Sequence, residues 1–249
     1  MPFADHFSTL SPEYARYRPR YPASLAAVLA AAAGRRDQAW DCGTGSGQAA
    51  VMLAGEFSRV LGTDPSAQQL AHAEQHPRVT YRLGRESDSG LTGGSVDLVT
   101  AAQAAHWFDL PAFYREAERV LRPGGVLALW CYGLESFSPE IDEVLSWFYD
   151  DRVGRYWPPE RCHVDAGYET LGFPYARLPL PPQAIEARLD REGLLRYVGT
   201  WSAVDRCRRA EGREPLIDLA ESLKTVWPDG TEPRLARWPL SILAGRPDR

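Results

Sequence analysis

The most chemically suggestive part of this sequence is a run of glycines between two acidic residues. Asp41 precedes Gly43, Gly45 and Gly47 in the pattern D-x-G-x-G-x-G, and Asp64 follows after an apolar run. Glycines after a first strand let the backbone come close to a ligand. The charge of Asp41 opposes a pyrophosphate at this turn and attracts a positive group instead. The pattern therefore predicts a ligand that carries a cation near the glycines.

Asp64 ends a second predicted strand, "RVLGTD". An acid at that place commonly accepts hydrogen bonds from ribose hydroxyls, and such charge-assisted bonds contribute roughly 1.5 to 3 kcal/mol each. A ligand with a ribose, no phosphate, and ammonium and sulfonium groups is S-adenosylmethionine. A nicotinamide-dependent oxidoreductase would share the alternating fold but needs G-x-G-x-x-G, which is absent after the first strand. Two plainer interpretations stay open: the glycines serve strand-to-helix packing, and Asp64 caps a helix.

His106 and Trp107, in "QAAHWFD", follow the fourth predicted strand. A histidine with a pKa near 6.5 suits proton removal from a hydroxyl acceptor, whereas a carboxylate acceptor is already ionised and needs no base. His106 is the candidate catalytic residue, either as a base or as a donor that orients an acid. The alternative is a packed histidine followed by Asp109 as a helix cap.

Strands that alternate with helices must position these residues. Short apolar runs at "QAWDC", "RVLGTD", "VTYRL", "SVDLVTAA" and "VLALWCY" are separated by helical patterns, which indicates a parallel sheet covered on both faces. With "QAIEARL" as a sixth strand and "RWPLSILAG" as a final one, we predict an α/β, Rossmann-like, seven-stranded, mostly parallel sheet. Ligands of such sheets bind at the carboxyl ends of the strands.

We predict that residues 1–249 form a single domain. Residues 134–182 are rich in proline and aromatics and lack a clear period, so we expect an inserted substrate cap there, between the fifth and sixth strands. The run "ASLAAVLAAAAG" imitates a signal peptide, but polar, aromatic and proline residues precede it, and Pro22 and Gly34 mark it as a helix.

Charge and cysteine usage limit the partners. Lys and Arg number 28 against 33 Asp and Glu, a formal net charge of −5, which leaves no basic surplus for nucleic acid or an anionic membrane. No run is long enough for a membrane span. The four cysteines form no C-x-x-C pair, and Cys162 beside His163 does not make a metal site, so we expect free thiols, a cytoplasmic protein and no metal.

Several motifs together resemble one family. "DCGTGSGQAA" and "VLGTDPS" look like the first motif and ribose-acid strand of class I S-adenosylmethionine-dependent methyltransferases. "YARYRPRYP", "VDLVTAAQAAHWFD", "RVLRPGGVLALW" and "YVGTWS" look like the small-molecule branch with a methyltransferase type 11 domain that includes trans-aconitate methyltransferase-like proteins. This resemblance covers nearly the whole chain.

The resemblance implies a set of cofactor-binding residues. The glycines line the methionine part, Asp41 lies near its ammonium group, and Asp64 holds the ribose. The loop "GRESDSGL" is expected at the adenine, although Arg85 departs from the common pattern there. The full cofactor set is Asp41, Gly43, Thr44, Gly45, Gly47, Asp64, Pro65, Glu86, Ser87, Gln103, Tyr17 and Arg18, with Asp88 as a further candidate at the adenine.

The acceptor is expected between an N-terminal lid, residues 1–21, and the cap. Tyr14, Tyr17 and Arg18 form a lid over the cofactor or, alternatively, pack on the surface. The predicted substrate-binding residues are Tyr14, His106, Trp107, Tyr156 and Trp157. The expected reaction is O-methylation of a small carboxylate or hydroxyl compound, with S-adenosylhomocysteine as the product. N-methylation of a heterocycle or amine and a non-catalytic cofactor-binding protein stay open, and the oligomeric state is unassigned.

Overall fold

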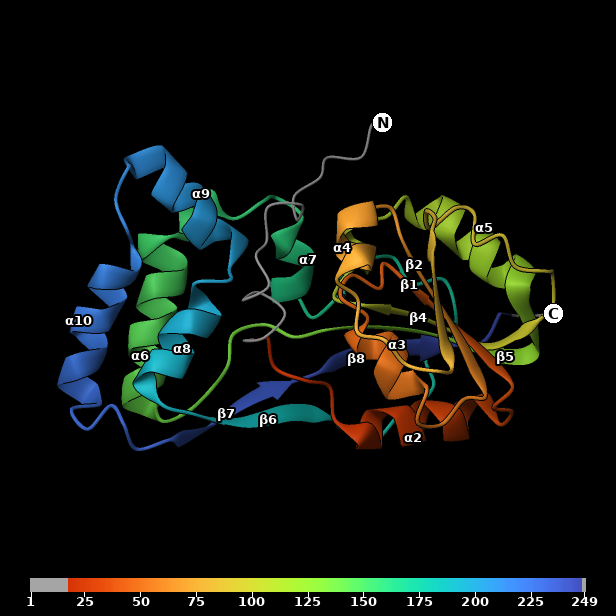
Figure 1. Cartoon of the computed structure of the whole chain (residues 1–249), viewed down its shortest axis with the longest axis horizontal. Coiled ribbons are helices and arrows are strands. Elements are labelled where there is room, and N and C mark those ends of the chain that lie inside the picture. Colours follow the sequence, from red (N-terminus) through yellow and green to blue (C-terminus); the bar gives the residue numbers. More distant parts are fainter. Residues whose placement is uncertain (1–17, 248–249) are drawn as a thin grey trace.

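A six-stranded sheet carries the strand ends singled out above (Figure 1). The computed structural model describes residues 18–247. The sheet has the order β3-β2-β1-β4-β5-β8; β8 alone runs antiparallel to its neighbour. Its strands are β1 (Gln38–Cys42), β2 (Arg59–Asp64), β3 (Val79–Leu83), β4 (Val96–Ala102), β5 (Leu121–Cys131) and β8 (Ser241–Gly245).

Helices cover both faces of this sheet, as the alternating pattern predicts. On one face, α2 (Ala23–Ala33) packs on β4 and β5, and α3 (Gln48–Leu53) packs on β1 and β2, with leucines of both helices buried. On the other face, α5 (Leu110–Val120) buries Phe113 and Ala117. The short helices α4 (Ala67–Ala71) and η1 (Ala105–Trp107) follow β2 and β4. The carboxyl ends of β1, β2 and β4 therefore meet at one edge.

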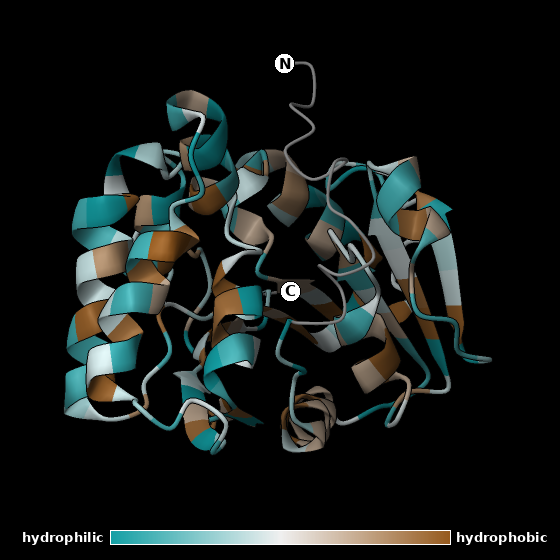
Figure 2. Cartoon of the chain, turned by 60° about the vertical axis from the view of Figure 1, so that its left-hand side comes forward, coloured by the Kyte–Doolittle hydropathy of each residue, from teal (hydrophilic) through white to brown (hydrophobic). Residues whose placement is uncertain are grey.

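A helical lobe is inserted between β5 and β8 and lies beside the sheet, on the left in Figure 1. Its helices alternate hydrophilic and hydrophobic bands (Figure 2) and enclose a core of their own, which includes Phe148 and Trp227. The lobe contains α6 (Pro139–Trp147), η2 (Phe148–Arg152), η3 (Gly154–Tyr156), α8 (Arg191–Val198), α9 (Ser202–Glu211) and α10 (Leu216–Val226), and α7 (Arg161–Asp165) lies between it and the sheet. No helix within residues 18–247 is long and apolar enough to cross a membrane.

The prediction of a seven-stranded sheet was wrong in strand number. "QAIEARL" does form a strand, β6 (Ala184–Leu189), but it pairs with β7 (Arg234–Pro239) in a separate two-stranded sheet. The predicted final strand "RWPLSILAG" is divided: β7 belongs to this small sheet, and β8 pairs with β5 after Leu240. The inserted lobe also uses helices well beyond residue 182, because α8, α9 and α10 precede β8.

Candidate active site

The turn after β1 has a backbone that only glycine adopts easily. Gly43, Gly45 and Gly47 have φ of 69°, 53° and 82°, in the left-handed region. A Cβ atom added at Gly47 would lie 2.1 Å from the Tyr81 hydroxyl, whereas one added at Gly45 would meet nothing within 4 Å. The turn is thus packed against β3 at Gly47 and open at Gly45, which leaves room for a ligand to approach the backbone there.

Asp41 lies fully buried beneath this turn. Its carboxylate accepts hydrogen bonds from the hydroxyls of Thr44, at 2.6 Å, and Thr100, at 2.8 Å. Burial raises the pKa of Asp41 to about 6; the two hydroxyls oppose the rise, and the charge of Asp64 adds to it. A positive ligand group at the turn would stabilise the ionised form of Asp41.

Asp64, the last residue of β2, is hydrogen-bonded to the same turn. Its Oδ2 atom accepts a hydrogen bond from the backbone N–H of Gly45, and its Oδ1 atom accepts one from Ser66, both at 2.9 Å. The cap of α4 is Ser66, whose hydroxyl accepts from the N–H of Gln69. Pro65 connects Asp64 to this cap.

The loop after β3 lies next to the start of α5. Oε1 of Glu86 accepts a hydrogen bond from the backbone N–H of Asp109 at 3.4 Å, and Asp88 accepts one from Gly90 within its own loop. Asp109 caps α5 through Ala112, as the capping alternative predicts. Ser87 lies between Glu86 and Asp88.

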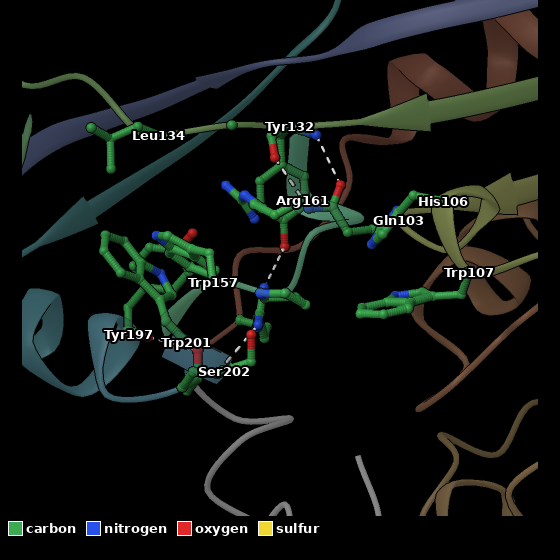
Figure 3. A pocket seen from close by; sticks show the side chains of 14 residues that line it. Gln103, His106, Trp107, Tyr132, Leu134, Trp157, Arg161, Tyr197, Trp201 and Ser202 are labelled. Atoms are coloured by element: carbon green, nitrogen blue, oxygen red, sulfur yellow. Dashed lines mark hydrogen bonds between the residues drawn. The ribbon is translucent and has the colours of Figure 1, made fainter. Parts of the chain in front are cut away.

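A pocket opens between the strand ends and the lobe (Figure 3). His106, Trp107 and Gln103 form one side, and Trp157, Tyr197 and Trp201 form the other (Figure 3). The lining residues are Arg18, Gln103, His106, Trp107, Tyr132, Gly133, Leu134, Trp157, Pro158, Arg161, Tyr197, Thr200, Trp201 and Ser202. Six of these fourteen residues carry aromatic rings, and two arginines supply positive charge.

Gln103 joins the ends of β4 and β5. Its φ of 54° is unusual for a residue other than glycine. Its side-chain amide donates to the carbonyl of Tyr132 at 3.1 Å and accepts from the N–H of Tyr132 at 2.9 Å. The Gln103 amide therefore holds the chain segments after β4 and β5 together where both line the pocket.

Arg161 presents a guanidinium group to the pocket from α7. Its Nε atom donates to the Tyr149 hydroxyl at 2.6 Å and to Asp165 at 3.1 Å. The guanidinium also lies 4.5 Å from the centre of the Trp157 ring. Within the described range, no hydrogen bond uses the Nη atoms of Arg161, so they remain available to a ligand.

His106 lies opposite the lobe. Its Nδ1 atom is 2.9 Å from the hydroxyl of Tyr168, and its ring lies 4.9 Å from that of Trp107. Burial lowers the pKa of His106 to about 3, and the positive charges of Arg161 and His163 add to this effect. The imidazole is therefore neutral at physiological pH.

The structure brings most of the predicted site residues to one edge of the sheet, with exceptions. Tyr156 lies away from the pocket, and its hydroxyl donates to Glu211. Tyr14 and Tyr17 lie outside the described residues. Arg18 does line the pocket, where it donates to the Tyr132 hydroxyl at 3.2 Å and to the carbonyl of Thr200. The residues that the sequence did not reveal are Tyr132, Arg161, Tyr168, Tyr197 and Trp201.

Comparison with known proteins identifies the fold and the chemistry. Residues 40–129 match the family described as "Methyltransferase domain". A protein of Dictyostelium discoideum that is named a methyltransferase is 35% identical over 225 residues, which cover 89% of this chain and 86% of that one. A Saccharomyces cerevisiae protein named as an S-adenosylmethionine-dependent methyltransferase is 31% identical, over 59% of this chain and 55% of that protein.

A solved structure agrees over nearly the whole chain. A protein of Anaeromyxobacter dehalogenans described as a type II methyltransferase is 47% identical, with a TM-score of 0.87 over 92% of this chain and 97% of that one. The open glycine turn and the two acids beside it suit a cofactor with a ribose and a positive charge, so the geometry and the relatives agree. The chain belongs to the class I S-adenosylmethionine-dependent methyltransferases.

Proposed function

We propose that this methyltransferase methylates an oxygen atom of a small carboxylic acid bound in the pocket between the sheet and the lobe. S-adenosylmethionine supplies an electrophilic methyl group on a sulfonium. The glycine turn holds its methionine part, Asp41 stabilises its ammonium group, and Asp64 accepts hydrogen bonds from its ribose. Gln103 lines the pocket and directly follows β4, so the pocket adjoins this proposed cofactor site at the strand ends.

The observation that carries the choice of acceptor is Arg161. Its Nη atoms make no hydrogen bond within the described residues, and a guanidinium pairs well with a carboxylate. A cationic amine in the same pocket would be repelled by Arg161 and Arg18. The charge of the pocket thus favours an acid over the amine substrates of N-methylation.

The state of His106 supports a carboxylate over a hydroxyl acceptor. A phenol or alcohol must lose its proton during transfer, and an efficient base has a pKa close to the working pH. Burial holds the pKa of His106 at about 3, which makes it a weak base. A carboxylate is already ionised at neutral pH, so it needs only to be oriented and shielded from water.

A transfer assay with labelled S-adenosylmethionine tests this proposal. Each acceptor is offered as a matched set with one carbon skeleton: the acid, its amide, the alcohol and the amine. We expect label transfer to acids, with a product that releases methanol in mild alkali, as a methyl ester does. Transfer to the amine or the alcohol, with acids inert, would overturn the proposal. Binding of S-adenosylhomocysteine by calorimetry verifies that the protein used is competent for the cofactor.

A further inference from the structure

The hydroxyl of Tyr168 determines how His106 is presented to the pocket. Tyr168 follows α7, is fully buried and has a φ of 65°, a costly conformation for an aromatic residue. Its hydroxyl lies 2.9 Å from Nδ1 of His106, and within residues 18–247 this is the one hydrogen-bond partner of that hydroxyl. The strained segment thus places the hydroxyl against the ring of His106.

This contact assigns the proton positions. The Tyr168 hydroxyl is fully buried, so its proton needs an acceptor, and Nδ1 of His106 is the partner that the described residues offer. If Nδ1 carried the proton instead, the hydroxyl proton would be buried without an acceptor, which is costly. A neutral imidazole with an accepting Nδ1 carries its proton on Nε2.

We propose that Tyr168 is a positioning residue that holds His106 as an Nε2–H donor to the acceptor carboxylate, and that His106 is not a base. This inference rests on the proposed function. Arg161 and His163 both disfavour a second proton on the ring, and so does its burial. His106 therefore stays a neutral donor across the pH range in which the enzyme would work.

A fixed donor suits methyl transfer to an acid. Nε2–H binds one carboxylate oxygen and directs the other towards the methyl group. The transfer forms an O–C bond and breaks the S–C bond, whose electron pair stays on sulfur, and no proton moves. A donor that cannot take up a proton is sufficient for this step, and alignment of the reacting atoms supplies the rate.

The first test reads the tautomer directly and needs neither cofactor nor acceptor. Nitrogen-15 NMR of the histidine side chains gives the protonated nitrogen of each ring, and His106→Gln identifies the signal among the five histidines. We expect the Nε2–H form in the parent protein at pH 7, and loss of this single form in Tyr168→Phe. A proton on Nδ1 in the parent would overturn the proposal. Tyr114→Phe, which removes a buried hydroxyl that has no hydrogen-bond partner in the described part of the chain, is the matched control.

The second test uses steady-state kinetics with an acid acceptor. The glutamine amide can replace an Nε2–H donor but cannot act as a base. We expect His106→Gln to keep kcat within about threefold of the parent value. His106→Ala should raise the KM of the acid about tenfold, and Tyr168→Phe should raise it severalfold. The pH-rate profile of the parent should be flat from pH 6 to 9. If His106→Gln loses about a hundredfold in kcat together with a neutral-range titration of the parent, His106 is a base and the proposal fails.

Failure of this inference can be distinguished from failure of the proposed function. If the acceptor panel shows that only amines are methylated, the proposed function fails, while the NMR arm still decides which nitrogen carries the proton. If acids are methylated but Nδ1 carries the proton, only this inference fails.

Discussion

The carboxylate of Asp64 accepts a hydrogen bond at 2.9 Å from the backbone N–H of Gly45. The acid at the end of β2 and the turn after β1 are therefore one unit: Asp64 helps to hold the glycine conformation, and in the proposed cofactor site it also binds the ribose. A single change at Asp64 should consequently affect both the turn and the cofactor.

Replacement of Asp64 is expected to weaken cofactor binding more than it weakens the fold. Asp64→Ala should raise the Kd of S-adenosylhomocysteine by about 10- to 150-fold, which corresponds to one lost charge-assisted hydrogen bond of roughly 1.5 to 3 kcal/mol. Asp64→Asn, which keeps one acceptor oxygen, should lie between the alanine variant and the parent. Calorimetry gives the affinity, and thermal unfolding gives the stability.

The control for this series is Asp229→Ala, in the loop before β7, which removes an acid that accepts hydrogen bonds from Thr231 far from the turn. It should leave the Kd unchanged. A collapse of the unfolding temperature in Asp64→Ala with an unaltered Kd would show that Asp64 is purely structural.

The glycine turn provides a matched pair of substitutions. Both Gly45→Ala and Gly47→Ala place alanine at positive φ, which costs about 1 kcal/mol or more. Only Gly47→Ala also directs its Cβ into the Tyr81 ring, so it should destabilise the cofactor-free protein clearly more than Gly45→Ala does. Urea unfolding without ligand measures the difference. Equal losses in the two variants would mean that the packing of Gly47 on Tyr81 contributes nothing.

The glycine turn was predictable from the sequence because its information is local. Asp41 and the three glycines lie within seven residues, and Asp64 follows after one short helix at the end of the next strand. The strand regions of the main sheet were predictable for the same reason. The partner of a strand is different: nothing in "QAIEARL" or "RWPLSILAG" distinguishes pairing within the main sheet from pairing with each other.

The pocket proposed for the acceptor was much less predictable. Arg161 lines the same pocket as His106 because α7 lies between the lobe and the sheet, and the contact of Tyr168 with His106 joins residues 62 positions apart. The opposite wall, with Tyr197 and Trp201, comes from a lobe that folds as its own core. Such a juxtaposition depends on tertiary packing, so no spacing in the sequence indicates it.

Arg161 should determine how well acids bind. Arg161→Gln is expected to raise the KM of a carboxylate acceptor by about 10- to 150-fold, because the pocket loses a charged donor, while the Kd of S-adenosylhomocysteine stays the same. Arg155→Gln is the control: Arg155 is exposed and paired with Glu211, outside the pocket. An unchanged KM in Arg161→Gln would remove Arg161 from the acceptor site.

The buried carboxyl of Glu135 should make the stability of the protein depend measurably on pH. It follows β5 beside the pocket residue Leu134 and is 3% exposed, and neither of its carboxyl oxygens has a hydrogen-bond partner among residues 18–247. Burial raises the pKa of Glu135 to about 7 from its ordinary value near 4.5. Between these two pH values the folded protein binds more protons than the unfolded chain, so this residue lowers the free energy of unfolding as pH rises.

Glu135→Gln removes that slope because the amide is neutral at every pH. The free energy of unfolding of the variant relative to the parent should therefore rise between pH 5 and pH 8, by a few kcal/mol. The opposite slope from His106, whose lowered pKa makes stability rise with pH between about 3 and 6.5, is present in both proteins and cancels in the difference. Urea unfolding at pH 5, 6, 7 and 8 measures this difference in the free energy of unfolding. Glu143→Gln, on the exposed face of α6, is the control. Parallel pH curves for Glu135→Gln and the parent would show that Glu135 ionises as freely in the folded protein as in the unfolded chain.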